Sequence, residues 1–313
     1  MKKNNRFTTL SASFHALMGA CGLLALLLAM TAPALADVAA GRAAFEAGDY
    51  AAAQSNFLAA ANGGDREAQY WMGLVYDGGF GVEEDADKAL EWFLKSANQG
   101  YDEAERVVGS YYEIGKSVGR SFRDAALWYQ KAADHGNAKA LRNLGSLYLD
   151  GRGVPNDRDK AVALFEQAAA KGNGKAMRNL GYIYYFGEGI GRDPKRAAEY
   201  FAAAARTGLD KAEFDLGRLY FRGDGVPRDL ARAARHFQTA AEEGVAKAQL
   251  FLGRMYAMGE GVAKDPVTAY FWLTLAATEE QEAARVYLSD LERSLSSAQI
   301  EQATSRAKAF RPK

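Results

Sequence analysis

Two short segments of the chain carry the same potentially functional residues at the same spacing. KALRN begins at Lys139 and KAMRN begins at Lys175, so each supplies a lysine, an arginine and an asparagine. The planar guanidinium of arginine binds a carboxylate through two parallel hydrogen bonds. We therefore hypothesise an anion-recognising pocket formed by Arg142, Asn143, Arg178 and Asn179. The competing interpretation is that the lysines are solvated and the asparagines bond neighbouring backbone.

Other arrangements that could do chemistry are weaker. The Gly-x-Gly at Gly151 and Gly153 could cradle a phosphate, but a phosphate loop follows a strand, and no strand-like alternation precedes this pair. SYYEIGKS, residues 110–117, misses a nucleotide-binding loop by one residue. Ser305-x-x-Lys308 matches one motif of penicillin-interacting enzymes whose two other motifs are missing. The acidic run 83–85 is interpreted as a solvated loop, with calcium binding as the alternative. We predict no catalytic residues, no nucleotide, no metal and no other cofactor.

A 36-residue repeat positions these residues. Six glycines stand at 36-residue intervals, each followed by a tyrosine after three positions and by another glycine after six. The repeated glycines are Gly73, Gly109, Gly145, Gly181, Gly217 and Gly253. Apolar residues at helical spacing surround them, so each unit predicts two helices joined by a turn. Such short helices are marginal alone, and stacking would bury their apolar faces in an all-α solenoid.

The repeat also explains the Gly-x-Gly. Glycine adopts the left-handed conformation that a helix C-terminus needs, so this pair ends the first helix of each unit. The second helix then begins after an N-cap residue. The expected N-caps are Asp85, Ser121, Asp157, Asp193, Asp229 and Asp265. The mid-helix glycine indicates that another backbone packs too closely for a side chain. Ser117 replaces the second turn glycine, so that turn is expected to be longer or looser.

These features resemble a known family. The motif LG-x-x-Y-x-x-G-x-G-V-x-x-D-x-x-x-A, followed by an aromatic pair, Ala-Ala and Gly, resembles the Sel-one-like repeat, a branch of the tetratricopeptide superfamily. The resemblance covers about Asp37 to Ala284 and implies a right-handed α-α superhelix that binds other macromolecules. We predict a tetratricopeptide-like repeat at 37–67, six Sel-one-like repeats at 68–283 and capping helices at 284–313, the last of them capped at Ser296 or Ser297.

The resemblance also suggests a binding surface. In tetratricopeptide relatives, the first-helix positions three before, one after and four after the glycine line a concave groove, and helical periodicity places them on one face. Arginines there suit carboxylates, and exposed aromatic residues supply anchor area. The predicted partner-binding residues are Arg106, Lys139, Arg142, Asn143, Lys175, Arg178, Asn179, Tyr182, Tyr185, Arg218 and Phe221.

Residues 1–36 have the pattern of an export signal. Basic residues precede an apolar run from Ala16 to Met30, and small residues suitable for signal peptidase end at Ala36. The run is shorter than the roughly 20 residues of a membrane span. We expect a periplasmic or secreted protein after cleavage near Ala36. The alternatives are an uncleaved anchor and a lipoprotein at Cys21, which the continuing apolar run disfavours.

Composition and charge narrow the class of partner. The chain has 39 basic and 39 acidic residues, so it has no basic excess with which to neutralise nucleic acid. Cys21 is the only cysteine, so a cleaved chain has no disulfide. We predict an exported scaffold for protein or peptide partners in the cell envelope, with acidic polysaccharide as a further ligand class. The alternatives are a periplasmic regulator that restrains a membrane sensor or polysaccharide-secretion component and, from another class, a penicillin-interacting hydrolase.

Overall fold

The computed structural model describes residues 37–187, 190–277 and 281–313. The predicted export signal, residues 1–36, lies outside the described residues. All regular elements of the described chain are α-helices, which confirms the all-α helical repeat fold. Within the same residues, no helix is long and apolar enough to cross a membrane. The chain divides between Val108 and Gly109 into two compact units, each described by itself.

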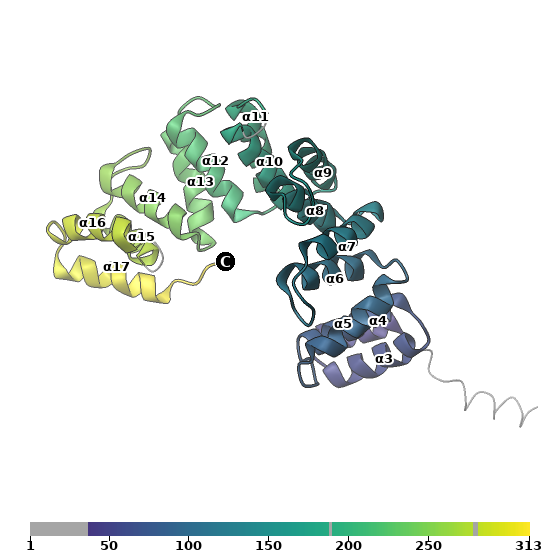
Figure 1. Ribbon diagram of the computed structural model, residues 1–313. Helices are drawn as coiled ribbons and strands as arrows, with labels where there is room; N and C mark the ends of the chain where they lie inside the picture. The colour runs from purple at the N-terminus through teal and green to yellow at the C-terminus, as the bar shows by residue number, and fades with distance from the viewer. Residues whose placement is uncertain (1–36, 188–189, 278–280) are drawn as a thin grey trace, which may run out of the picture. The chain divides into compact units, whose positions relative to one another are not determined.

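In the first unit, the first four helices pack against one another in chain order (Figure 1). The helices of this unit are α2 (Val38–Glu46), α3 (Tyr50–Asn62), α4 (Arg66–Asp77), α5 (Ala86–Ala97) and the start of α6 (Asp102–Ile114). Phe57 and Met72 are fully buried in its core. The ring of Phe57 contacts the position that a Cβ on Gly41 would occupy, so α2 and α3 reproduce the glycine-to-ring packing of the later repeats.

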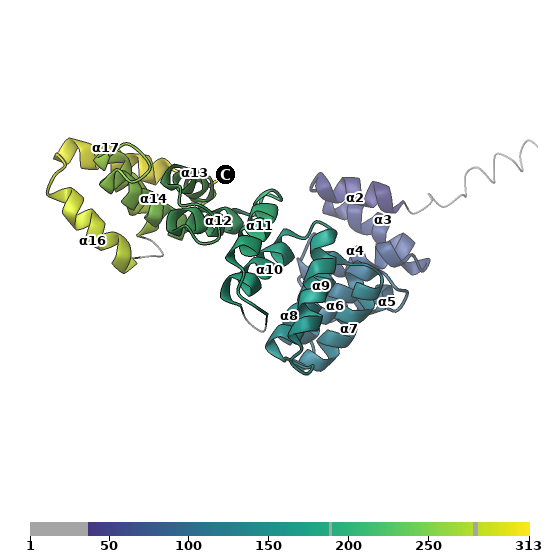
Figure 2. The same cartoon turned by 90° about the horizontal axis from the view of Figure 1, so that it is seen from above.

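The second unit continues with successive hairpins. Its helices after α6 are α7 (Phe122–Asp134), α8 (Ala138–Asp150), α9 (Arg158–Ala170), α10 (Gly174–Phe186), α11 (Pro194–Ala205), α12 (Asp210–Arg222), α13 (Leu230–Glu242), α14 (Ala246–Met258), α15 (Pro266–Ala276), α16 (Gln281–Glu292) and α17 (Ser297–Ala309). Figure 2 shows α10 with α11 and α12 with α13 as adjacent pairs, in agreement with their contacts. Fully buried leucines and aromatic residues, including Leu144, Phe165 and Leu180, fill the space between the pairs.

The turns follow the residue types that the sequence repeats. Each expected N-cap side chain accepts a hydrogen bond from the backbone at the start of its helix. The expectation of a looser second turn was wrong, because Ser117 adopts the left-handed conformation itself, at φ 59°, close to the 72° of Gly153. Ser121 N donates to Tyr112 O at 2.9 Å, as Asp157 N does to Tyr148 O at 3.0 Å, so the two turns close alike.

The mid-helix glycines make room mainly for a ring. A Cβ on Gly181 would lie 2.6 Å from Cε1 of Phe201, and one on Gly145 would lie 2.9 Å from Cε1 of Phe165. The backbone expected at this position is a lesser contact, since Ala161 O lies 3.3 Å from the Cβ position of Gly145. The glycine therefore lets the two helices of one hairpin approach across a buried aromatic side chain.

The C-terminal helices complete the second unit. Ser296 caps α17, and its side chain and that of Gln299 form a reciprocal capping box. The following segment, residues 310–313, returns to the end of α13, where Lys313 N donates to Glu242 O at 3.2 Å. The ring of Phe310 packs against Trp272, with ring centres 5.8 Å apart.

Candidate functional site

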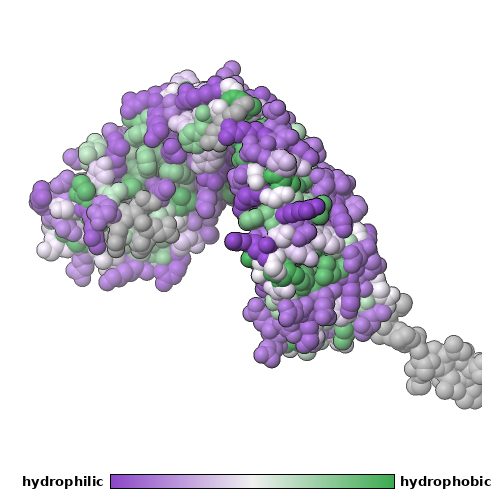
Figure 3. Space-filling view, viewed as in Figure 1, coloured by the Kyte–Doolittle hydropathy of each residue, from purple (hydrophilic) through white to green (hydrophobic). Residues whose placement is uncertain are grey.

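A cavity of about 700 Å³ lies in the second unit, bordered by α10, α12 and the start of α14. Its lining combines aromatic and cationic side chains, namely Tyr182, Phe214, Phe251, Arg178, Arg218 and Arg222. Figure 3 shows apolar surface over α12–α14 bordered by hydrophilic side chains. Such a lining offers an apolar wall and several hydrogen-bond donors to one ligand, which is the usual chemistry of a recognition site.

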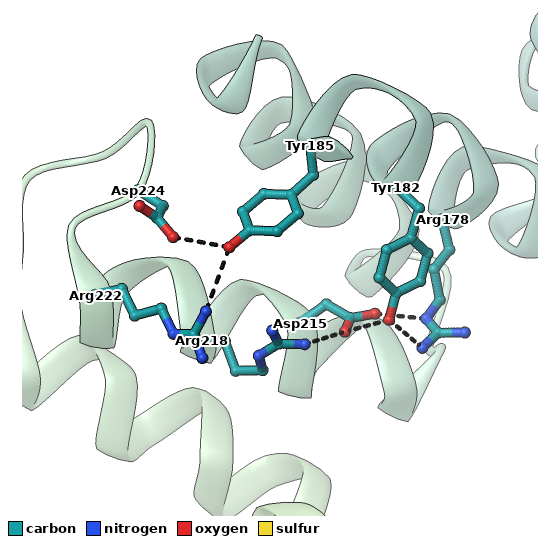
Figure 4. A network of polar contacts seen from close by, with 7 residues as sticks. All are labelled: Arg178, Tyr182, Tyr185, Asp215, Arg218, Arg222 and Asp224. Atoms are coloured by element: carbon teal, nitrogen blue, oxygen red, sulfur yellow. Dashed lines mark hydrogen bonds and ion pairs between the residues drawn. The ribbon is translucent and has the colours of Figure 1, made fainter. Parts of the chain in front are cut away.

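A buried carboxylate organises one wall of this cavity. The side chain of Asp215 is 2% exposed and receives Arg178 Nε at 2.6 Å and the hydroxyl of Tyr182 at 2.7 Å. Arg178 Nη2 also donates to the Tyr182 hydroxyl at 2.8 Å, and Arg218 lies 4.0 Å from the same carboxylate (Figure 4). Asp215 and Arg218 come from α12, whereas Arg178 and Tyr182 come from α10. The network therefore fixes the side chains that two consecutive repeats present to the cavity.

Burial dominates the electrostatics of this network. It raises the pKa of Asp215, although the hydrogen bond from Tyr182 and the charge of Arg178 oppose the rise. Burial and the neighbouring Asp215 raise the pKa of Tyr182 to about 12, so its hydroxyl stays protonated and donates at neutral pH. Arg178 and Arg218 are each about one-quarter exposed, at 26% and 27%, and so still reach the solvent. The wall can thus present guanidinium groups to an anion while a carboxylate holds them in place.

A second network lies near the ends of the same helices. The hydroxyl of Tyr185 donates to Asp224 Oδ2 at 2.9 Å and lies 3.5 Å from Arg222 Nη1 (Figure 4). Next to it, Phe186 is 57% exposed, and its ring stacks on Tyr182 with centres 6.0 Å apart. An exposed aromatic residue thus adjoins the cation-lined cavity.

A smaller cavity of about 340 Å³ lies one repeat earlier. Lys139, Arg142 and Lys175 line it together with turn residues that include Asn173 and Thr207. No carboxylate occurs among its described lining residues. The charged residues that line this cavity are therefore all cationic, whereas the lining of the larger cavity also contains acidic residues.

The predicted partner-binding residues are divided among these places. Arg178, Tyr182 and Arg218 line the larger cavity, whereas Lys139, Arg142 and Lys175 line the smaller one. The single pocket expected of Arg142, Asn143, Arg178 and Asn179 is therefore not formed: Asn143 accepts a hydrogen bond from Arg142, and half-buried Asn179 lines neither cavity.

Three further predicted residues have other surroundings. Tyr185 belongs to the second network, and the ring of Phe221 packs against Phe251 with centres 5.8 Å apart. Arg106 lies in the first unit, where its Nε pairs with Glu103 Oε2 at 2.9 Å. Whether any of these residues contacts a partner remains a prediction.

Asp215 and Phe251 were not predicted. Both stand two positions before the repeat glycine, where Asn143 and Asn179 stand in earlier repeats. The sequence signal that could have identified them is the change of residue type at this repeat position. Asparagine stands there in two earlier repeats, and aspartate and then phenylalanine stand there in the next two. Among the described residues, no group of three metal-ligating side chains gathers anywhere.

Comparison with known proteins identifies the repeat. Six consecutive segments match the model of the Sel1 repeat, at residues 66–101, 102–137, 138–173, 174–209, 210–245 and 246–280. Sel1 repeats generally form non-catalytic scaffolds for protein–protein interactions. A comparison with curated proteins gives no match.

One solved structure shows the same fold. The crystal structure of a Sel1 repeat protein from Oxalobacter formigenes is 30% identical with a TM-score of 0.74, and the match covers 77% of this chain and 99% of that one. A protective antigen from uropathogenic Escherichia coli, described as displaying an SLR fold, is 27% identical over 83% of this chain and 71% of its own, with a TM-score of 0.44. With six matched segments across most of its length, the chain belongs to the Sel1 repeat family.

Proposed function

We propose that this chain is an exported scaffold that binds a protein partner of the cell envelope through the cavity between α10, α12 and α14. The observation that carries the proposal is the cavity wall in which buried Asp215 holds Arg178 and Tyr182 beside Phe214 and Phe251. Family membership supports the scaffold role, and the pattern of residues 1–36 supports export.

The cavity chemistry suits a protein segment that ends or carries an anionic group next to an apolar side chain. Aromatic and arginine side chains are enriched at the energetic centres of protein interfaces. Arg218 and Arg222 can donate to a carboxylate, and Phe251, half-buried, offers apolar contact area. We therefore propose recognition as the role of this cavity.

Affinity capture from envelope extracts tests this function. The tagged chain is compared with the double variant Arg218→Ala/Arg222→Ala, identifying captured proteins by mass spectrometry. The matched control is Arg206→Ala/Arg235→Ala, which removes two exposed arginines, the C-cap residue of α11 and one residue of α13, that line no described cavity. We expect capture of specific proteins to fall at least about tenfold in the first variant, the equivalent of about 1.4 kcal/mol, and to persist in the control.

The outcomes separate the alternatives. Recovery of several assembly components supports a scaffold, whereas recovery of one membrane sensor supports the regulator instead. Equal capture by the unaltered chain and the Arg218→Ala/Arg222→Ala variant would refute the cavity as the binding site. Export is tested separately by fusing residues 1–36 to a phosphatase that is active only outside the cytoplasm, and an inactive fusion contradicts it.

A further inference from the structure

Four lysines recur at one helical position of the second unit. Each is the second residue of its helix, in α8, α10, α12 and α14, and each is exposed. We call this set the basic column; it consists of Lys139, Lys175, Lys211 and Lys247. Consecutive members are separated by one 36-residue repeat, so they follow the axis along which the hairpins stack.

Helix stability does not account for the basic column. The N-terminus of a helix carries a partial positive charge, so acidic residues stabilise its first turn and cations oppose it. The first unit obeys this rule, since the second residues of α4 and α6 are Glu67 and Glu103. Four lysines in the unfavourable position indicate that another requirement determines the residue type there.

The two cavities place the lysines beside possible binding space. Lys139 and Lys175 line the smaller cavity together with Arg142. Lys211 and Lys247 line the larger one, where five cations face the carboxylates of only two lining residues, Asp210 and Glu243. Each cavity therefore lies between two neighbouring lysines and has a cationic lining.

We propose that the basic column binds an extended acidic peptide segment of the partner, with one carboxylate for each repeat; this rests on the proposed function. Arg178 on α10 pairs directly with Asp215 on α12, and we take about 10 Å, the upper end of the range for helices in contact, as the spacing of these two helices. An extended chain advances about 3.3 Å per residue. An acidic residue at every third position therefore matches the lysine spacing.

A peptide is favoured over other polyanions by the wall of the larger cavity. Phe214 and Phe251 provide apolar surface within the cationic lining, and a peptide can place an apolar side chain there while its acidic residues face the lysines. Acidic polysaccharide and single-stranded RNA share the charge, and both are included as competing probes.

Fluorescence anisotropy with defined probes tests the proposal on the full mature chain. The spaced probe is a labelled (Glu-Gly-Ser)4 peptide, and the clustered probe has the same composition with its four glutamates contiguous. We expect the spaced probe to bind at least about fivefold more tightly than the clustered one and to weaken as salt rises, since exposed charges are screened. A glutamine version of the spaced probe should not bind.

Matched variants locate the binding surface. The test variant replaces all four lysines of the basic column by glutamate. The control makes the same charge change at four exposed lysines of the second unit that line neither cavity, namely Lys131, Lys195, Lys264 and Lys308. We expect at least about a tenfold loss of affinity in the test variant, through four lost and reversed ion pairs, and less than about twofold in the control. Circular dichroism verifies that both variants fold.

Several results would overturn the proposal: no binding of the spaced probe, equal affinity for the spaced and clustered probes, equal losses in the two variants, or tighter binding of a polyuronate oligomer or of poly(U) than of the peptide. Partner capture distinguishes this failure from failure of the proposed function. If the basic-column variant still captures the partner but Arg218→Ala/Arg222→Ala does not, the cavity binds the partner and the acidic-peptide inference is wrong.

Discussion

The two units use the same helical position in opposite ways. In the first unit, Glu67 Oε1 accepts from Trp71 Nε1 at 3.4 Å and pairs with Arg42 at 3.3 Å. Glu103 pairs with Arg106 one turn along its own helix. These acids favour the helix dipole and have local partners, so folding alone explains them.

The second unit departs from this pattern both at its surface and inside. Lysines replace the acids at the helix starts, and among the described residues no ion pair is formed by Lys175, Lys211 or Lys247. Two positions before the repeat glycine, the first unit has Trp71 and Val107, whereas the second places Asp215 in a buried position. Cations at helix N-termini, which oppose helix stability, and a buried carboxylate that depends on specific partners thus occur around the two cavities, as expected where selection acts on recognition.

The buried carboxylate provides the strongest test of this comparison. Replacing Asp215 by alanine leaves Arg178 and the Tyr182 hydroxyl without their acceptor and Arg218 without its ion-pair partner, so we expect a loss of about 3 kcal/mol in the free energy of unfolding. Asp215→Asn should cost less than about 1 kcal/mol, because its amide oxygen still accepts from Tyr182 and no charge is desolvated. Urea denaturation followed by circular dichroism measures both. Equal losses in the two variants would mean that packing, and not the polar network, determines stability there.

Charge exchange between the units provides a second test. Changing the four lysines of the basic column to glutamate should raise the stability of the second unit by about 1–2 kcal/mol, because each change reverses an unfavourable interaction with a helix N-terminus. The reciprocal Glu67→Lys/Glu103→Lys should destabilise the first unit by about 1 kcal/mol or more, since Arg42 and Arg106 also lose their partners. Native-state hydrogen exchange reads the two units separately. Unchanged protection in both would contradict the interpretation that the lysines oppose folding.

Much of the fold could be predicted because local requirements are visible in residue type. The N-cap at Asp157 and the left-handed turn at Gly151 each depend on the chemistry of one residue and its nearest neighbours. Recurrence over six repeats then made the stacked architecture predictable. Ser117 was misjudged because serine is rarely left-handed, and the surrounding turn hydrogen bonds nevertheless hold it there.

The site was less predictable because it depends on how one repeat lies against the next. The column alignment compares residues 36 apart, whereas Arg178 contacts Asp215, 37 residues later. This 37-residue separation depends on how α10 lies against α12. Neither repeat, taken alone, contains a residue pattern that predicts it. The predicted stripe therefore included Arg178, Tyr182 and Arg218 but not the carboxylate of Asp215 that all three surround. By contrast, the continuation of the lysines to Lys211 and Lys247 was readable from the sequence.

Two tyrosines, one in each unit, provide the smallest and most specific test. Burial is the main cause that raises the pKa of Tyr101 in the first unit and of Tyr182 in the second to about 12. A folded-state pKa above the unfolded value of about 10 means that the stabilisation is complete below pH 10 and is lost as the pH rises towards 12. The free energy of unfolding should therefore fall as the pH rises from 10 to 12. Because both rings are partly exposed, we expect Tyr101→Phe and Tyr182→Phe each to make this fall smaller by only about 1 kcal/mol.

The effect of Asp215 separates the two tyrosines. The charge and the hydrogen bond of Asp215 also raise the pKa of Tyr182, whereas for Tyr101 the largest charged contribution after burial comes from Glu67. Asp215→Asn should therefore lower the pKa of Tyr182 and leave that of Tyr101 unchanged. The absorbance of tyrosinate is followed through an alkaline titration. Subtracting the curve of each Tyr→Phe variant from that of its parent isolates the titration of one tyrosine, both in the unaltered chain and in the Asp215→Asn variant. If Asp215→Asn shifts neither titration, burial alone sets the pKa of Tyr182, and the network is weaker than its short distances imply.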